Sequence, residues 1–159
     1  DRQHQRVREG RQGNEFLLVH ADQSGSQRDV TITQKDVNEV QLAKGAIRAG
    51  IDILLDTTDT AAEEVEEVII AGAFGSFLKV QSALDIGLLP HLPNARYRQV
   101  GNAALMGARR ALISRQARMR ARQIAAQTTY RELSTSPQFT RRFAIGMYFP
   151  QPDEEISKK

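Results

Sequence analysis

A short apolar run that ends in two glycines is the feature that most constrains the fold. Residues 68–77 read Val-Ile-Ile-Ala-Gly-Ala-Phe-Gly-Ser-Phe, in a chain with only 11 glycines. A short run rich in β-branched residues is typical of a strand buried on both faces, as in a parallel sheet. Glycines directly after such a strand allow either a tight turn or the close approach of a ligand to the backbone. The pattern alone leaves both interpretations open.

Strand-like and helix-like segments alternate along the rest of the chain. Strands are indicated at residues 16–19, 30–32, 68–71, 96–100 and 129–133. Helices are indicated at residues 33–55, 80–86, 102–114, 115–127 and 136–147. This order predicts an α/β domain with a partly parallel sheet. We expect a flexible polar N-terminus over residues 1–15, one domain over 16–150 and a flexible tail over 151–159.

Composition excludes several classes of protein. The chain has no cysteine, so it holds no disulfide, no thiolate metal site and no cysteine-bound iron–sulfur cluster. The three histidines are isolated, and no metal site is predicted. No apolar run approaches the length of a membrane span, and the first residues do not resemble a signal peptide. We therefore expect a cytoplasmic protein that does not bind membranes.

Two stretches outside the glycine-rich turn could bind a ligand. Gln41, Lys44 and Arg48 are spaced three and four apart, so they share one face of the helix expected at 33–55. A lysine and an arginine there can clamp a ribose or a phosphate, or they can simply lie on a solvated face. Gly101-Asn102 ends one expected strand and opens the next helix. A nucleotide could approach the backbone there, although close helix packing also explains the small residues.

Charge is distributed unevenly. Residues 1–93 carry nine Lys/Arg and fifteen Asp/Glu, whereas residues 94–142 carry eleven arginines and one acid. The arginines on the two expected helices are Arg109, Arg110, Arg115, Arg118, Arg120 and Arg122. They can dock an acidic protein, or they can lie on a solvated face at the rim of a homodimer. Nucleic-acid binding is not expected, because no aromatic residues are interleaved with these arginines.

Three stretches together resemble one family. They are residues 32–55, 68–90 and 99–114, and the closing residues 128–150 look similar as well. They resemble the C-terminal domain of the reductive activators of corrinoid proteins. That domain belongs to the superfamily of actin, sugar-kinase and heat-shock chaperone ATPases. The resemblance implies part of a ribonuclease-H-like lobe, with a mixed sheet and flanking helices.

The resemblance also implies a site. Residues 68–75 look like the adenosine loop, which would place nucleotide against Gly72, Ala73, Phe74, Gly75 and Ser76. The helix that carries Gln41, Lys44 and Arg48 would cover adenine and ribose, and Gly101-Asn102 would lie nearby. The expected cofactor of the whole protein is ATP or ADP with magnesium.

Two departures from the family limit this expectation. A D-x-G-x-T phosphate hairpin does not occur in the chain, and there are no cysteines for the two-iron two-sulfur cluster of the family's N-terminal domain. We therefore expect the adenosine-side piece of a longer activator, which uses ATP to return an inactive Co(II) corrinoid protein to Co(I). We do not expect this piece alone to hydrolyse ATP, and its catalytic residues are not identified. The alternatives are a kinase or other nucleotide-binding member of the superfamily, or a basic interaction module without enzymatic activity.

Overall fold

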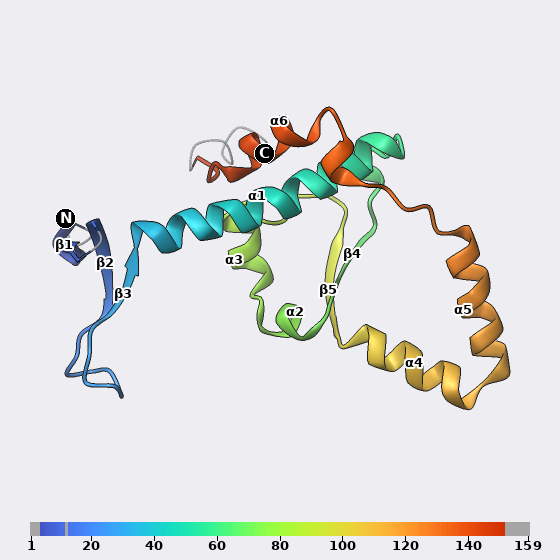
Figure 1. Cartoon of the computed structure of the whole chain (residues 1–159), viewed down its shortest axis with the longest axis horizontal. Helices are drawn as coiled ribbons and strands as arrows, with labels where there is room; N and C mark the ends of the chain where they lie inside the picture. Colours follow the sequence, from blue (N-terminus) through green and yellow to red (C-terminus); the bar gives the residue numbers. More distant parts are fainter. Residues whose placement is uncertain (1–3, 12, 152–159) are drawn as a thin grey trace.

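The computed structural model describes residues 4–11 and 13–151. Figure 1 shows an extended arrangement in which a small N-terminal sheet, a central helical pair, a second sheet and a two-helix arm follow one another. The predicted tail over residues 151–159 lies almost entirely outside the described residues.

The N-terminal sheet is antiparallel and has the order β1-β2-β3. Its strands are β1 (Val7–Gly10), β2 (Gly13–Val19) and β3 (Val30–Thr33), preceded by a 3-10 turn at His4–Arg6. Arg8 of β1 forms ion pairs with Glu15 of β2 at 2.8 Å and with Asp29 of the β2–β3 loop at 2.7 Å, and these tie β1 to β2 and to that loop. The strands at 16–19 and 30–32 were predicted, whereas β1 has a polar sequence that did not indicate a strand. Flexibility of residues 1–15 stays a prediction.

Helix α1 (Gln34–Thr57) starts where the sequence predicts. Thr33 is its N-cap: the Thr33 side chain accepts from the Asp36 amide, and the Asp36 carboxylate accepts from the Thr33 amide at 2.8 Å. This reciprocal pair satisfies two amides that the helix leaves free. The bond from the Thr33 amide, and a second from the Thr33 hydroxyl to the same carboxylate, lower the pKa of Asp36.

Helix α6 (Phe139–Met147) packs along α1 and is the main partner of that helix (Figure 1). The contact runs through two glycines. A Cβ at Gly146 would lie 3.0 Å from the Gly45 carbonyl oxygen, and a Cβ at Gly45 would lie 2.9 Å from Met147 Cγ. The backbones therefore approach more closely than any larger residue would allow. The final helix was predicted from residue 136 but begins at Phe139.

The second sheet consists of two parallel strands, β4 (Glu67–Ala71) and β5 (Arg96–Gly101). The short helices α2 (Ala73–Phe77) and α3 (Val80–Asp85) form the crossover between them, and a 3-10 turn at Ala62–Glu64 precedes β4. Ala83, Leu84 and Leu89 form a small core against which Ile70 packs. The strands expected at 68–71 and 96–100, the crossover helix and the parallel pairing are present, although the strands of the chain are divided between two sheets.

The two-helix arm consists of α4 (Ala103–Ile113) and α5 (Arg115–Gln127). Ser114 interrupts the helix as predicted, and its hydroxyl accepts from the Ala117 amide at 3.2 Å to cap α5. A connector then leads to a 3-10 turn at Leu133–Thr135 and to α6. The strand predicted at 129–133 is wrong, because these residues pair with no other strand in the structure described. None of the described helices is both long enough and apolar enough to cross a membrane.

Candidate functional site

The turn after β4 has the geometry that only glycine adopts easily. Gly72 has φ of 101° and caps the start of α2, and its amide donates to the Gly101 carbonyl oxygen at 2.6 Å. Gly101 also has a positive φ of 61°. Because β4 and β5 are parallel, both turns lie at the carboxyl ends of the strands, which is where ligands bind in open α/β sheets.

Two polar side chains, those of Ser76 and Asn102, lie beside the turns at Gly72 and Gly101. Ser76 Oγ lies 3.4 Å from the Gly72 carbonyl oxygen, and a Cβ at Gly101 would lie 3.8 Å from Ser76 Oγ. Asn102 caps α4 by accepting from the Leu105 amide at 2.9 Å. We call Gly72, Ser76, Gly101 and Asn102 the glycine-loop site. The structure brings together these four residues, which the sequence predicted from two separate stretches.

Gly75 contributes close packing rather than open space. A Cβ at this position would lie 2.7 Å from Ile70 Cγ2, so α2 rests directly on β4. Gln99 of β5 donates to the carbonyl oxygens of Gly75 and Leu78, the latter at 2.6 Å, and holds the end of α2. At Gly72, by contrast, no atom of the described residues lies within 4 Å of where a Cβ would be. Open space for a ligand is therefore at Gly72.

The predicted row on α1 binds the C-terminal segment. Gln41 Nε2 donates to the Met147 carbonyl oxygen at 3.2 Å. Lys44, which is only 1% exposed, donates to the carbonyl oxygens of Gly146 at 2.5 Å and Tyr148 at 2.7 Å. Arg48 pairs with Asp52 on the next turn of α1 at 3.0 Å. Two of the three predicted side chains are therefore engaged with backbone at the end of α6.

Lys44 is a buried cation that forms no ion pair with any carboxylate of the described residues. Burial lowers the pKa of Lys44, and the nearby Arg48 guanidinium lowers it further. The free-energy cost of burying this charge is offset by the two carbonyl oxygens and by the Phe149 ring, whose centroid is 5.2 Å from Lys44 Nζ. In Figure 1, α6 and the part of α1 that it packs against lie near the amino ends of β4 and β5, whereas α2 and the start of α4 lie at the carboxyl ends of these strands. The structure thus does not bring the α1 row to the glycine loop.

The six predicted partner-binding arginines are all exposed on the arm. Arg118 reaches back across the break, where Nε donates to the Ala111 carbonyl oxygen at 3.1 Å and stabilises the end of α4. No acidic residue occurs anywhere between positions 102 and 127. Among the described residues none of these six arginines forms an ion pair, so the arm presents positive charge to solvent.

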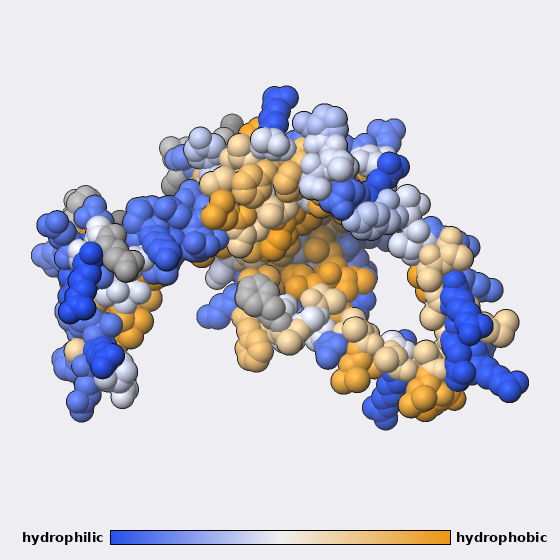
Figure 2. Space-filling model, in the orientation of Figure 1, coloured by the Kyte–Doolittle hydropathy of each residue, from blue (hydrophilic) through white to orange (hydrophobic). Residues whose placement is uncertain are grey.

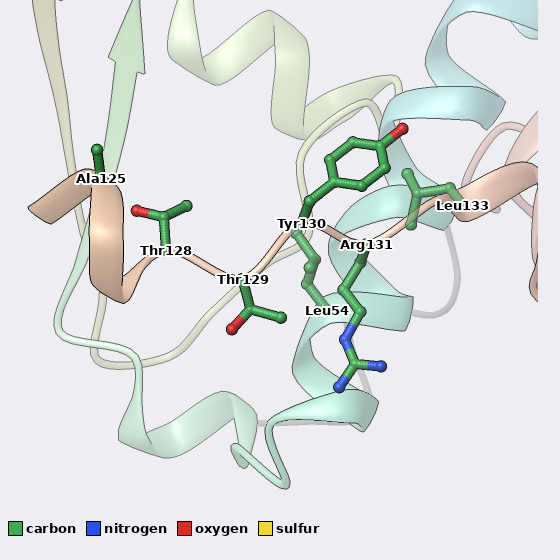
Figure 3. Close-up of a pocket in the computed structure, with 7 residues that line it drawn as sticks. All are labelled: Leu54, Ala125, Thr128, Thr129, Tyr130, Arg131 and Leu133. Atoms are coloured by element: carbon green, nitrogen blue, oxygen red, sulfur yellow. The ribbon is translucent and has the colours of Figure 1, made fainter.

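A pocket that the sequence did not indicate lies between α1 and the connector after α5 (Figure 3). It has a volume of about 500 Å³. It is lined by Leu54, Ala125, Thr128, Thr129, Tyr130, Arg131 and Leu133. Most of this lining comes from residues 129–133, for which a strand is expected from the sequence, so no pattern in the sequence predicts the pocket.

Metal ligands are not assembled in the part of the chain that the structure describes. No group of three or more His, Cys, Asp or Glu side chains there could hold an ion. The residues present thus fit the adenosine side of a nucleotide site, through the open backbone at Gly72, but supply no magnesium site among the described residues.

Comparison with known proteins identifies relatives over most of the chain and a family profile over all of it. A family profile for the C-terminal domain of RACo, the ASKHA domain, matches residues 1–159. The corrinoid activation enzyme RamQ of Eubacterium limosum is 38% identical over 134 residues, which is 84% of this chain and 23% of RamQ. A solved structure of a reductive activator for corrinoid,iron-sulfur protein is 39% identical. It covers 98% of this chain with a TM-score of 0.82, and the match is 25% of that protein. The predicted fold class is confirmed, and the chain spans about a quarter of the length of these relatives.

Proposed function

Because the chain belongs to the family of C-terminal ASKHA domains of the corrinoid reductive activators, we propose that it forms the adenosine side of an ATP-dependent activator. The parent protein would return an inactive Co(II) corrinoid protein to Co(I). The observation that carries this proposal is the glycine-loop site at the carboxyl ends of two parallel strands. The relatives of this chain that are named above are a corrinoid activation enzyme and a reductive activator.

The nucleotide would lie against the open backbone at Gly72 and Gly101. Ala73, Phe74, Gly75 and Ser76 would form the turn of α2 beneath it, and Ser76 and Asn102 would supply polar contacts. Binding and hydrolysis of ATP would supply the free energy for an electron transfer that is otherwise unfavourable. The magnesium ligands and the two-iron two-sulfur cluster would come from parts of the parent protein outside these residues.

A contribution of Gln41, Lys44 and Arg48 of α1 to nucleotide binding depends on the position of the C-terminal segment. Contact between adenosine and Gln41 or Lys44 requires the carbonyl oxygens of residues 146–148 to be released, since they accept from both side chains. Arg48 is half-buried and already paired with Asp52. A role for these three residues in nucleotide binding therefore includes movement of the C-terminal segment.

The partner would be an acidic face of the corrinoid protein, in the cytoplasm. Arg109, Arg110, Arg115, Arg118, Arg120 and Arg122 would attract it. Exposed arginines act over distance and are screened by salt, so affinity for the corrinoid protein should fall steeply with ionic strength. A shallow dependence would favour the other interpretation, in which these arginines surround a homodimer interface.

The test uses the full-length protein and the variant Gly72→Ala. A Cβ at a φ of 101° is strained and would occupy the space left for nucleotide. We expect ATP affinity, measured by calorimetry, to fall at least about tenfold. The matched control is Gly25→Ala, since Gly25 also has no neighbour within 4 Å of a Cβ but lies in a loop of the N-terminal sheet.

Unchanged ATP affinity in a folded Gly72→Ala protein would refute the proposed site. The activity is tested separately, by following ATP-dependent conversion of Co(II) to Co(I) in a corrinoid protein by its absorbance. Transfer of phosphate from ATP to a sugar or acyl acceptor without corrinoid reduction would instead show a kinase.

A further inference from the structure

Helix α2 is too short to be stable by itself. It has only five residues, and no side chain of the described residues caps its first amides. Isolated helices of this length are unstable in water, because most of their backbone groups have no partner within the helix. The glycine-loop site nevertheless depends on α2, since Gly72 is the N-cap of this helix and Ser76 lies on it. The shape of the site is therefore set by the contacts that hold α2 in place.

Strand β5 holds α2 at both ends. At the beginning of the helix, the Gly72 amide donates to the Gly101 carbonyl oxygen at 2.6 Å. At the other end, Gln99 Nε2 donates to the carbonyl oxygens of Gly75 and Leu78, the latter at 2.6 Å. Carbonyl oxygens in the last turn of a helix have no donor within the helix. Gln99 thus caps the end of α2 from a neighbouring strand.

The chemistry and the position of the Gln99 side chain match this task. A glutamine amide has two N–H groups, which is the number that the two carbonyl oxygens require. Gln99 pairs with Ile70 of β4, so it lies next to the strand end that leads into the turn at Gly72. Tyr97, two residues earlier and therefore on the same face of β5, packs against the core that includes α3. Gln99 thus lies on the face of β5 that the crossover helices cover.

We propose that Gln99 is a positioning residue for the nucleotide: by holding the end of α2 against β5, it fixes the turn at Gly72 in the form that leaves room for a ligand. This role rests on the proposed function, because it concerns the same site. Both N–H groups of the Gln99 amide are engaged by α2, so Gln99 acts through α2 rather than by contact with the nucleotide. Without these bonds α2 unwinds from its C-terminal end. The φ of 101° at Gly72 is then no longer enforced, because glycine adopts positive and negative φ about equally well.

Replacing Gln99 by glutamate separates this role from the shape of the side chain. Glutamate has nearly the same shape, but its carboxylate has no N–H and repels the two carbonyl oxygens. Gln99 is exposed, so Gln99→Glu does not bury a charge and is expected to fold. In the full-length protein at pH 8, we expect the affinity for ATP, measured by calorimetry, to fall at least about tenfold.

Lower pH should reverse the effect in this variant. Protonation gives the carboxyl group one O–H donor, and the two carbonyl oxygens favour this protonated form. At pH 5 the deficit relative to the wild-type protein, measured at the same pH, should shrink to about threefold or less. Gln99→Met has no donor at any pH, so its deficit should be the same at pH 5 and at pH 8.

Gln116→Glu is the matched control for the added charge. It makes the same chemical change at an exposed glutamine of α5. Figure 2 shows this helix as a largely hydrophilic part of the surface, away from α2. Gln116→Glu should leave the affinity for ATP unchanged at both pH values. Urea unfolding gives the stability of each variant separately, so that affinities are compared among fully folded proteins.

A deficit at pH 8 that shrinks at pH 5 in Gln99→Glu, but not in Gln99→Met, supports the proposal. Wild-type affinity for ATP in folded Gln99→Glu at pH 8 would overturn it, and so would an equal deficit at both pH values. An equal loss in Gln116→Glu would attribute the effect to net charge and overturn it as well. A lower free energy of unfolding without any change in ATP affinity would show a merely structural role.

Failure of this proposal and failure of the proposed function can be told apart. If Gln99→Glu binds ATP as the wild-type protein does while Gly72→Ala binds it more weakly, the proposed site stands and the role of Gln99 is refuted. Absence of ATP binding by the wild-type protein would refute the proposed function itself, and the role of Gln99 with it.

Discussion

Replacing Lys44 by methionine tests what holds the C-terminal helix in place. Methionine keeps most of the aliphatic volume of lysine but removes the ammonium group that donates to the carbonyl oxygens of Gly146 and Tyr148. Because Lys44 is almost completely buried, water cannot easily replace the lost donors. We therefore expect Lys44→Met to detach α6 from α1.

The expected magnitude follows from the two hydrogen bonds. A hydrogen bond from a charged donor contributes about 1.5–3 kcal/mol. Removal of a buried ammonium also relieves its desolvation, which offsets part of the loss. We expect a net loss of about 2–4 kcal/mol in the local stability of α6, which corresponds to a roughly 30-fold to 1,000-fold larger opening constant.

Hydrogen exchange measures this locally in the full-length protein. Amides in residues 139–147 should exchange faster in Lys44→Met by the factor given above. The control is Lys35→Met, which makes the same chemical change at an exposed position in the first turn of α1 and should leave exchange unchanged. Unaltered exchange of α6 in folded Lys44→Met would refute the reasoning. Equal acceleration over residues 34–57 and 67–101 would show a global rather than a local effect.

The lowered pKa of Lys44 sets the sign of the pH dependence. Between its folded pKa and its ordinary value, the folded state binds fewer protons than the unfolded state, so this group favours folding more as pH rises. A neutral amine still has two N–H donors for the two carbonyl oxygens. Attachment of α6 in the wild-type protein should therefore persist at alkaline pH.

Two further changes have defined outcomes. Gly75→Ala places a methyl group against Ile70 and should destabilise the protein by about 1–3 kcal/mol in urea unfolding, whereas Gly25→Ala should have little effect. Little change in Gly75→Ala would mean that α2 can move away from β4. Thr33→Ala removes the cap of α1 and should cost about 1 kcal/mol, seen as faster exchange at residues 34–38. In the wild-type protein the contribution of Asp36 should be present above its unfolded pKa and lost as pH falls through its lowered folded pKa; unchanged exchange at low pH would contradict this.

Local signals explain which elements the sequence predicted correctly. Thr33 and Asp36 mark the start of α1, and Ser114 marks the break between α4 and α5, because capping depends only on neighbouring residues. The polar strand β1 was not predicted, since it is held by pairing with β2 rather than by an apolar pattern. Residues 129–133 have β-branched and aromatic side chains typical of a strand, but no partner strand pairs with them in the described structure.

The residues of the candidate site likewise divide into those that local sequence signals predicted and those whose contacts no local signal predicted. Gly72 and Gly101 were identified because positive φ and strand ends leave a signature in the sequence, and the family resemblance, now confirmed, strengthened it. The partners of Gln41 and Lys44 were not foreseen. Their acceptors lie more than 100 residues further along the chain, and a backbone carbonyl leaves no mark in the sequence.

The glycine contact between α1 and α6 has a consequence for synthesis on the ribosome. Gly45 and Gly146 are 101 positions apart, so at about 5–20 residues per second α1 waits roughly 5–20 seconds for its partner helix to be made. During that interval Lys44 lacks the carbonyl oxygens of residues 146 and 148 as acceptors, and the side of α1 that α6 later covers is exposed to water. The helix that emerges first in this segment is therefore completed by the one that emerges last, and nascent chains stopped before residue 139 should bind chaperones that recognise exposed apolar helices.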